Sequence, residues 1–117
     1  MTATLQLDLV LDNLIKALGT KVYFIIITSE NGAVIKSYIN QEFNKTVIGL
    51  NVSQLHDLAD EITSEIGIHS PDFNVIHSDN FYILSIRILG NIVILLTEDQ
   101  VEFSSVFEII NKCIVTN

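Results

Sequence analysis

The stretch KVYFIIITSENGAVIKSYI, from Lys21 to Ile39, contains two apolar runs joined by a turn with Asn31-Gly32. The first run, Val22 to Thr28, is β-branched or aromatic throughout and does not alternate with polar residues, which is typical of a central strand covered on both faces. Asn31 and Gly32 can supply the positive φ angles that a tight hairpin turn requires. We therefore expect a β-hairpin whose first strand lies near the centre of a sheet, with the rest of the fold organised around it.

The composition is that of one folded domain, which we expect to span residues 1–117. Hydrophobic residues make up 49% of the chain and charged residues 17%, which argues against disorder. The formal net charge of −8 disfavours binding to nucleic acid or to anionic membrane surfaces, because both attract Lys and Arg. The apolar runs are too short to span a bilayer, and the single cysteine, Cys113, cannot form an internal disulfide. These features predict a cytoplasmic protein without direct membrane insertion.

Three helices are predicted around the strands. The first runs from Ala3 to Leu18, where apolar residues recur at i, i+3, i+4 and i+7. The second begins after Asn51 as N-cap and ends at Gly67. The third opens with a capping-box pair, Asp99 and Glu102. In the second helix the predicted apolar stripe is Val52, Leu55, Leu58, Ala59, Ile62 and Ile66, and the predicted polar face is His56, Asp57, Asp60, Glu61, Ser64 and Glu65.

Three more strands are predicted at Asp72 to His77, Phe81 to Ile88 and Ile92 to Thr97. Their short connections force antiparallel neighbours. Because central strands should be the most apolar, the first and fifth strands are expected to form the inner pair. The predicted fold class is therefore α/β (α+β), with the order α-β-β-α-β-β-β-α. Its five-stranded antiparallel sheet has the order 2-1-5-4-3, counted along the chain, and helices cover both faces.

This element order, together with IIITSENGAVIKS (residues 25–37) and NFYILSIRILGNIVILLTED (residues 80–99), resembles the roadblock/LC7 family over essentially the whole chain. Longins and profilins are related alternatives, but longins usually start with the hairpin, and profilins differ in strand count and helix order. GAF and PAS sensors are a further alternative. Their usual size and longer ligand-enclosing loops fit this chain less well.

The resemblance implies a non-catalytic module without a cofactor, which forms a homodimer and binds and regulates or scaffolds a Ras-like small GTPase. Members of the family often pair the third strands of two copies and pack the second helices side by side. An open strand edge favours such pairing because its N–H and C=O groups are unsatisfied. The alternatives are a small-molecule sensor of the GAF/PAS type and a purely structural assembly subunit. The positions that match the family interface are Phe73, Val75 and His77 in the third strand and Leu55, Leu58 and Ile62 in the second helix.

No motif for a metal site or for paired-carboxylate catalysis stands out. The spacing of His56, His69 and His77 does not match a compact ligand set, so we expect ordinary surface or strand-end histidines and no metal. The acidic residues at 57, 60, 61 and 65 can share a helix face, but such a run is usually a solvated flank. The sequence therefore predicts no enzyme.

Two further residues invite a functional interpretation. Arg87 could be taken for an arginine finger, but it lies inside a predicted strand, which favours a structural salt bridge or an exposed strand face. Cys113 falls on the apolar stripe of the last helix and is expected to be a small core residue. Neither glycine-rich phosphate-loop motif occurs, so the chain is not itself a P-loop nucleotide hydrolase.

Overall fold

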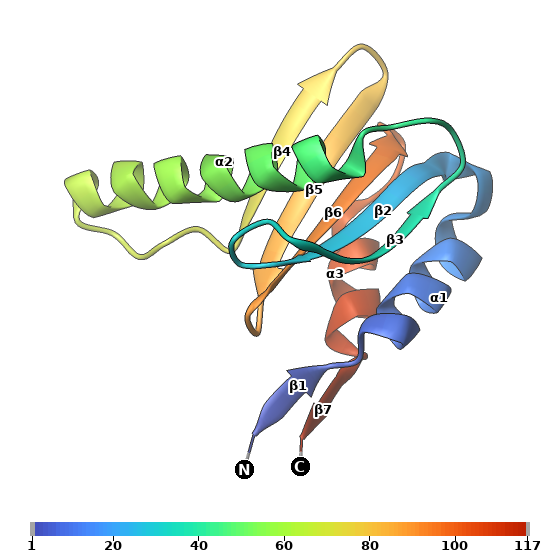
Figure 1. Ribbon diagram of the computed structural model, residues 1–117, viewed down its shortest axis with the longest axis horizontal. Coiled ribbons are helices and arrows are strands. Elements are labelled where there is room, and N and C mark those ends of the chain that lie inside the picture. The colour runs from blue at the N-terminus through green and yellow to red at the C-terminus, as the bar shows by residue number, and fades with distance from the viewer. Residues whose placement is uncertain (1, 117) are drawn as a thin grey trace.

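The computed structural model describes residues 2–116. Figure 1 shows a twisted sheet with α2 lying across one side and α1 and α3 on the other, while residues 3–5 and 114–116 lie side by side. In chain order the elements are β1 (Ala3–Leu5), α1 (Leu7–Leu18), the 3₁₀ turn η1 (Gly19–Lys21), β2 (Val22–Ser29), β3 (Val34–Ile39), α2 (Lys45–Ile66), β4 (Phe73–Ser78), β5 (Phe81–Ile88), β6 (Asn91–Glu98), α3 (Phe103–Asn111) and β7 (Ile114–Thr116).

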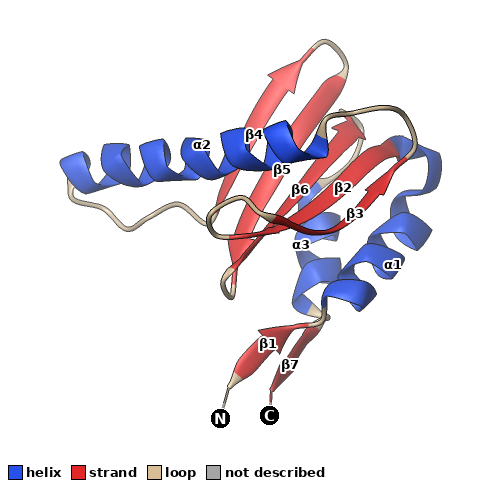
Figure 2. Ribbon diagram, viewed as in Figure 1, coloured by secondary structure: helices blue, strands red, loops and turns tan. Residues whose placement is uncertain are grey.

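The main sheet has five antiparallel strands in the order β3-β2-β6-β5-β4 (Figure 2). This confirms the predicted order, with the two most apolar strands at the centre and β3 and β4 at the edges. Ile26 of β2 lies opposite Ile94 of β6, and both side chains are fully buried. Burial on both faces explains why these two strands do not alternate between apolar and polar residues.

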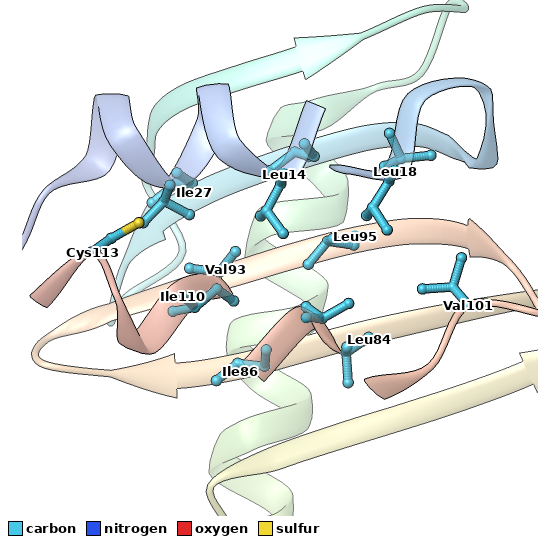
Figure 3. Packing of buried hydrophobic residues seen from close by; sticks show 14 of the residues in the cluster. Leu14, Leu18, Ile27, Leu84, Ile86, Val93, Leu95, Val101, Ile110 and Cys113 are labelled. Carbon is cyan, nitrogen blue, oxygen red and sulfur yellow. The ribbon is translucent and has the colours of Figure 1, made fainter. Parts of the chain in front are cut away.

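Each face of the sheet has its own core. On one face, Leu14 of α1 and Ile110 of α3 pack against side chains of the central strands such as Ile27 and Leu95 (Figure 3). On the other face, Val52 of α2 packs against a smaller cluster around Ile26 and the other inward residues of β2 and β6. The buried apolar cluster beneath α2 is thus the smaller of the two.

The hairpin between β2 and β3 is in close contact with α2. Gly32 alone in this turn has a positive φ, of 89°, so Asn31 does not share that role. A Cβ atom on Gly49 of α2 would lie 2.7 Å from the carbonyl oxygen of Gly32, which leaves no room for a side chain at the crossing. The Ser53 hydroxyl donates to the Glu30 carbonyl at 2.7 Å and joins the turn to the helix. These contacts hold the N-terminal half of α2 on the hairpin.

The predicted start of the first helix is wrong. Residues Ala3–Leu5 form β1, which pairs antiparallel with β7 at the other end of the chain, and α1 begins only at Leu7. The Gln6 N–H donates to the Cys113 carbonyl at 2.9 Å and closes this small ribbon. Local periodicity could not reveal the ribbon, because its partner lies more than a hundred residues away.

The predicted start of the second helix is also wrong. Its N-cap is Asn44, whose side chain accepts a hydrogen bond from the Val47 N–H at 3.2 Å, and not Asn51. The sequence does not indicate the first turns of α2, because they contain Gly49 and glycine is a poor helix former. The predicted end is confirmed, since Gly67 caps α2 in the left-handed conformation.

The third helix is shorter than predicted. It begins at Phe103, and its N-cap, Glu102, makes no side-chain capping bond, so the predicted capping box with Asp99 is wrong. Cys113 follows the helix but is fully buried, as expected of a core residue. Burial raises the pKa of its thiol, although the Asn13 amide group 3.7 Å from the sulfur acts in the opposite direction.

Candidate interaction surface

The apolar residues of α2 are divided between the core and the solvent. Its buried residues are Gly49, Val52, Ser53 and His56, whereas Leu58, Ile62 and Ile66 have exposed fractions of 57, 62 and 66%. Only Val52 of the predicted apolar stripe is buried in the core, and Leu55 is half-buried. The sequence leaves open which of Leu55, Leu58 and Ile62 face the sheet, and the structure turns Leu58 and Ile62 outward.

Polar side chains on the sheet explain this orientation. His56 is 1% exposed, and its Nε2 lies 2.9 Å from the Oγ of Ser85, a buried residue of β5. The Nδ2 atom of Asn74 in β4 lies 3.3 Å from Nδ1 of the same ring. If the Asn74 amide donates to Nδ1, the neutral ring carries its proton on Nε2 and donates it to Ser85. His56 is thus a buried, doubly hydrogen-bonded residue, which corrects its interpretation as a surface histidine.

Arg87 forms the next contact along the helix. Its guanidinium donates to both carboxylate oxygens of Asp60, at 2.8 and 2.6 Å, and to the Pro71 carbonyl at 3.3 Å. The predicted structural salt bridge is confirmed, while the prediction that Asp60 belongs to a solvated flank is wrong. The bonds from Arg87 lower the pKa of Asp60, and the carboxylate in turn raises the pKa of Arg87.

The edge strand β4 leaves one side of its backbone unpaired by the main sheet. The Asp72 carbonyl accepts a hydrogen bond from the Arg87 N–H at 2.9 Å, so the pair Asp72–Arg87 is a hydrogen-bonded pair of the antiparallel ladder. Hydrogen-bonded and non-hydrogen-bonded pairs alternate along such a ladder. The N–H and C=O groups of Phe73, Val75 and His77 therefore point away from β5, toward the open edge.

The side chains of these three residues lie on the α3 face of the sheet, opposite α2. The Phe73 ring packs 5.0 Å from that of Phe107 in α3, measured between centroids. The His77 ring lies 4.7 Å from that of Tyr82, and its Nε2 is 3.5 Å from a carboxylate oxygen of Asp99. The six predicted interface residues therefore lie on two sides of the sheet: the side chains of Phe73, Val75 and His77 on the α3 side, and the three α2 residues on the other. The backbone edge of β4 separates the two groups.

Sequence reasoning left other exposed apolar residues out of the predicted interface. Ile76 is exposed on the α2 side of β4, and Leu50 and Ile66 are exposed on α2. Side chains spaced four residues apart lie in one row along a helix. On α2 this row, called the ridge below, consists of Leu50, Gln54, Leu58, Ile62 and Ile66. In Figure 1 the C-terminal half of α2 extends past the strands, so the end of this ridge projects beyond the sheet. The four-residue spacing in the sequence could have revealed the ridge, but not the direction in which it points.

Two other features of residues 2–116 bear on a functional site: the grouping of metal-ligating side chains and the clefts. Among residues 2–116, no three His, Cys, Asp or Glu side chains come together to hold a metal ion. A cleft of about 380 Å³ lies beside α3 and is lined by Phe73, Phe107 and Ile110. In the same described range, no helix combines the length and apolar character needed to cross a bilayer.

No family model and no curated protein matches this chain. Solved structures do match. A roadblock/LC7 domain from Streptomyces avermitilis superimposes with a TM-score of 0.75 at 12% identity, covering 87% of this chain and 86% of that one. The chain has a roadblock/LC7-like fold.

Two further solved structures are similar to this chain. Myxococcus xanthus MglB matches with a TM-score of 0.69 at 14% identity, covering 79% of this chain and 76% of that one. Profilin IA from Acanthamoeba castellanii matches with a TM-score of 0.56 at 13% identity, covering 90% of each chain. At these identities the similarity establishes the fold and leaves the function to be inferred from the surface.

Proposed function

We propose that this chain is a single-domain, non-catalytic roadblock-type module of the cytoplasm that forms a homodimer and binds and regulates or positions a Ras-like small GTPase. The observation that carries the proposal is the outward apolar ridge of α2 beside the open edge of β4. In Figure 1 the C-terminal half of α2, which carries Leu58, Ile62 and Ile66, crosses β4 and β5 and extends past them. The ridge and the edge are each of a kind that natural proteins usually cover.

The ridge on α2 suits a second copy of the same helix. Leu50, Leu58, Ile62 and Ile66 follow the i±4 row, and two such rows interdigitate in the commonest class of helix crossing, at about −50°. A two-fold axis near Leu58 would bring Leu50 of one copy toward Ile66 of the other. The partner helix would then cover the residues that the sheet leaves exposed.

The β4 edge suits the same two-fold arrangement. The outward N–H and C=O groups of Phe73, Val75 and His77 could pair with those of a second β4 and extend the sheet across two copies. Pairing centred on Val75 would set Phe73 opposite the partner's His77. The exposed side chain of Ile76 lies on the α2 side of this seam, where it would add to the helix contact.

Two observations support a small GTPase as the further partner. The fold is shared with roadblock/LC7 domains and with MglB, one structure of which has a tetrameric arrangement. The net charge of −8 and the exposed acidic row of Asp57, Glu61 and Glu65 on α2 suit a partner with a basic surface. The cleft beside α3 is not needed for this role, and the proposal involves no cofactor.

Capture from the native lysate tests the GTPase partner. Immobilised wild-type protein should enrich a Ras-like GTPase to different extents in the presence of GDP and of a non-hydrolysable GTP analogue. Ile62→Glu should reduce the recovery, whereas Ile35→Glu, a comparably exposed site on the opposite edge strand, should not. Equal recovery in both nucleotide states would indicate a constitutive scaffold. Absence of any Ras-like GTPase in either state would contradict the proposed partner.

A further inference from the structure

His56 links the inner face of α2 to two strands. Its ring is buried between Ser85 of β5 and Asn74 of β4, and it bonds to both side chains. The charged groups around it are Asp57 and Asp60 of its own helix and Arg87 of β5, while β4 contributes only the neutral Asn74. The hydrogen bonds of this cluster are complete when the ring is neutral.

Protonation would disturb this cluster in two ways. A proton on Nδ1 converts the acceptor of the Asn74 bond into a donor. It also places a positive charge in a buried site near Arg87, whose Asp60 partner is already engaged by two hydrogen bonds. Burial, followed by the charge of Arg87, lowers the pKa of His56, and these effects outweigh the opposing carboxylates of Asp60 and Asp57. The docked helix therefore favours the neutral ring.

The two halves of α2 are held by different contacts. The N-terminal half has the close crossing of Gly49 over Gly32, the bond from Ser53 to Glu30, and Val52 in the core. From His56 onward, the side-chain hydrogen bonds to the strands come from His56 and Asp60, among the residues described. Loss of the His56 bonds would leave Asp60–Arg87 to hold the part of the helix that carries Leu58, Ile62 and Ile66.

We propose that His56 makes the docking of α2 on β4 and β5 sensitive to acid, so that protonation releases the C-terminal half of the helix and disperses the interaction surface. The inference rests on the proposed function, because it concerns regulation of the same surface. A single proton that binds only to the released state increases the opening constant by at most about tenfold per pH unit below 6.5. Two copies in a dimer would each contribute this factor.

Hydrogen exchange of the backbone amides measures the opening directly. Wild-type protein is compared at pH 7.5 and pH 5.5, with the rates corrected for intrinsic exchange. Protection of residues 57–66 should decrease by up to about tenfold at pH 5.5, while protection of the central strands β2 and β6 should not change. Unchanged protection of residues 57–66 would overturn the proposal.

Three variants separate the role of His56 from general effects of acid. His56→Gln keeps a neutral hydrogen-bonding side chain and should abolish the pH dependence in residues 57–66. Asn74→Asp places a carboxylate beside Nδ1 and should also weaken the dependence, because it stabilises the protonated ring. His69→Gln, at an exposed histidine outside the proposed interface, should leave the dependence intact. An equal loss of protection in wild type and His56→Gln would overturn the proposal.

The oligomeric state at pH 7.5 distinguishes this inference from the proposed function. A dimer whose α2 protection does not change with pH contradicts only the role of His56. A monomer at pH 7.5 whose α2 opens in acid contradicts the dimer and supports the acid sensitivity. Each combination of results therefore decides both questions.

Discussion

Replacing Gly49 by Ala tests the close crossing of α2 over the β2–β3 hairpin. Alanine favours a helix interior over glycine by about 1 kcal/mol, so propensity alone predicts a more stable protein. The new methyl group, however, would lie 2.7 Å from the Gly32 carbonyl oxygen and 3.2 Å from the Cγ2 of Thr28. Real Cβ atoms essentially never approach a backbone oxygen so closely, so the helix must move away from the turn.

The cost of that movement decides the sign. Overpacking of this kind costs about 1–3 kcal/mol. Displacement of α2 also weakens the hydrogen bond from Ser53 to the Glu30 carbonyl, now 2.7 Å long, which contributes about 0.5–1.5 kcal/mol. Together these effects exceed the gain in propensity. We expect Gly49→Ala to lower the free energy of unfolding by about 1–2 kcal/mol.

Urea denaturation at one fixed protein concentration measures this change, because association would otherwise contribute to apparent stability. Ser64→Ala, at an exposed position of the same helix, serves as the control and should change stability little. Ser53→Ala should cost less in the Gly49→Ala background than in wild type, since the hydrogen bond is already weakened. A Gly49→Ala protein as stable as wild type would refute the close crossing.

Three further predictions concern the polar cluster and the β4 edge. Arg87→Met should lower the free energy of unfolding, measured in urea titrations, by about 1–2 kcal/mol because it leaves Asp60 unpaired. As the control, Lys112→Met removes an exposed ion pair with Glu108 and should change this free energy by less than about 0.5 kcal/mol. Folding lowers the pKa of His56, so the unfolded chain binds a proton at a higher pH than the folded protein, and the free energy of unfolding should fall as pH drops below 6.5. His56→Gln should remove this pH dependence. Folding also lowers the pKa of Asp60, and the stability that this carboxylate contributes should be lost only below about pH 3.8. Val75→Pro removes an N–H that points to the open edge, so it should weaken dimerisation in sedimentation velocity without unfolding the protein; an undiminished dimer would exclude pairing at that edge.

The strand order could be predicted because the information for it is local. Short turns make β4, β5 and β6 antiparallel neighbours, and unbroken apolar runs mark β2 and β6 as central. The β1–β7 ribbon could not be predicted in this way, since three-residue strands at opposite ends of a chain carry no periodic signal. The register of this strand pair depends on contacts that form only in the folded chain.

The orientation of α2 could not be predicted from the sequence, for a different reason. A stripe of Leu58, Ile62 and Ile66 is normally taken as the face that meets a sheet. Here the sheet offers Ser85 and Arg87, residues some thirty positions away, and they bind the polar side of the helix instead. The apolar side is left for solvent or for a partner. The helix pattern alone cannot distinguish the two arrangements, because both bury one face.

Light scattering tests the central claim, that the outward ridge of α2 and the β4 edge form a homodimer interface. Wild-type protein should have about twice the 13.1 kDa mass of the chain at neutral pH. Ile62→Glu should shift the mass toward that of one chain, and Ile35→Glu should not. A wild-type protein that remains a monomer at high concentration, or an Ile62→Glu protein that remains fully dimeric, would contradict the account.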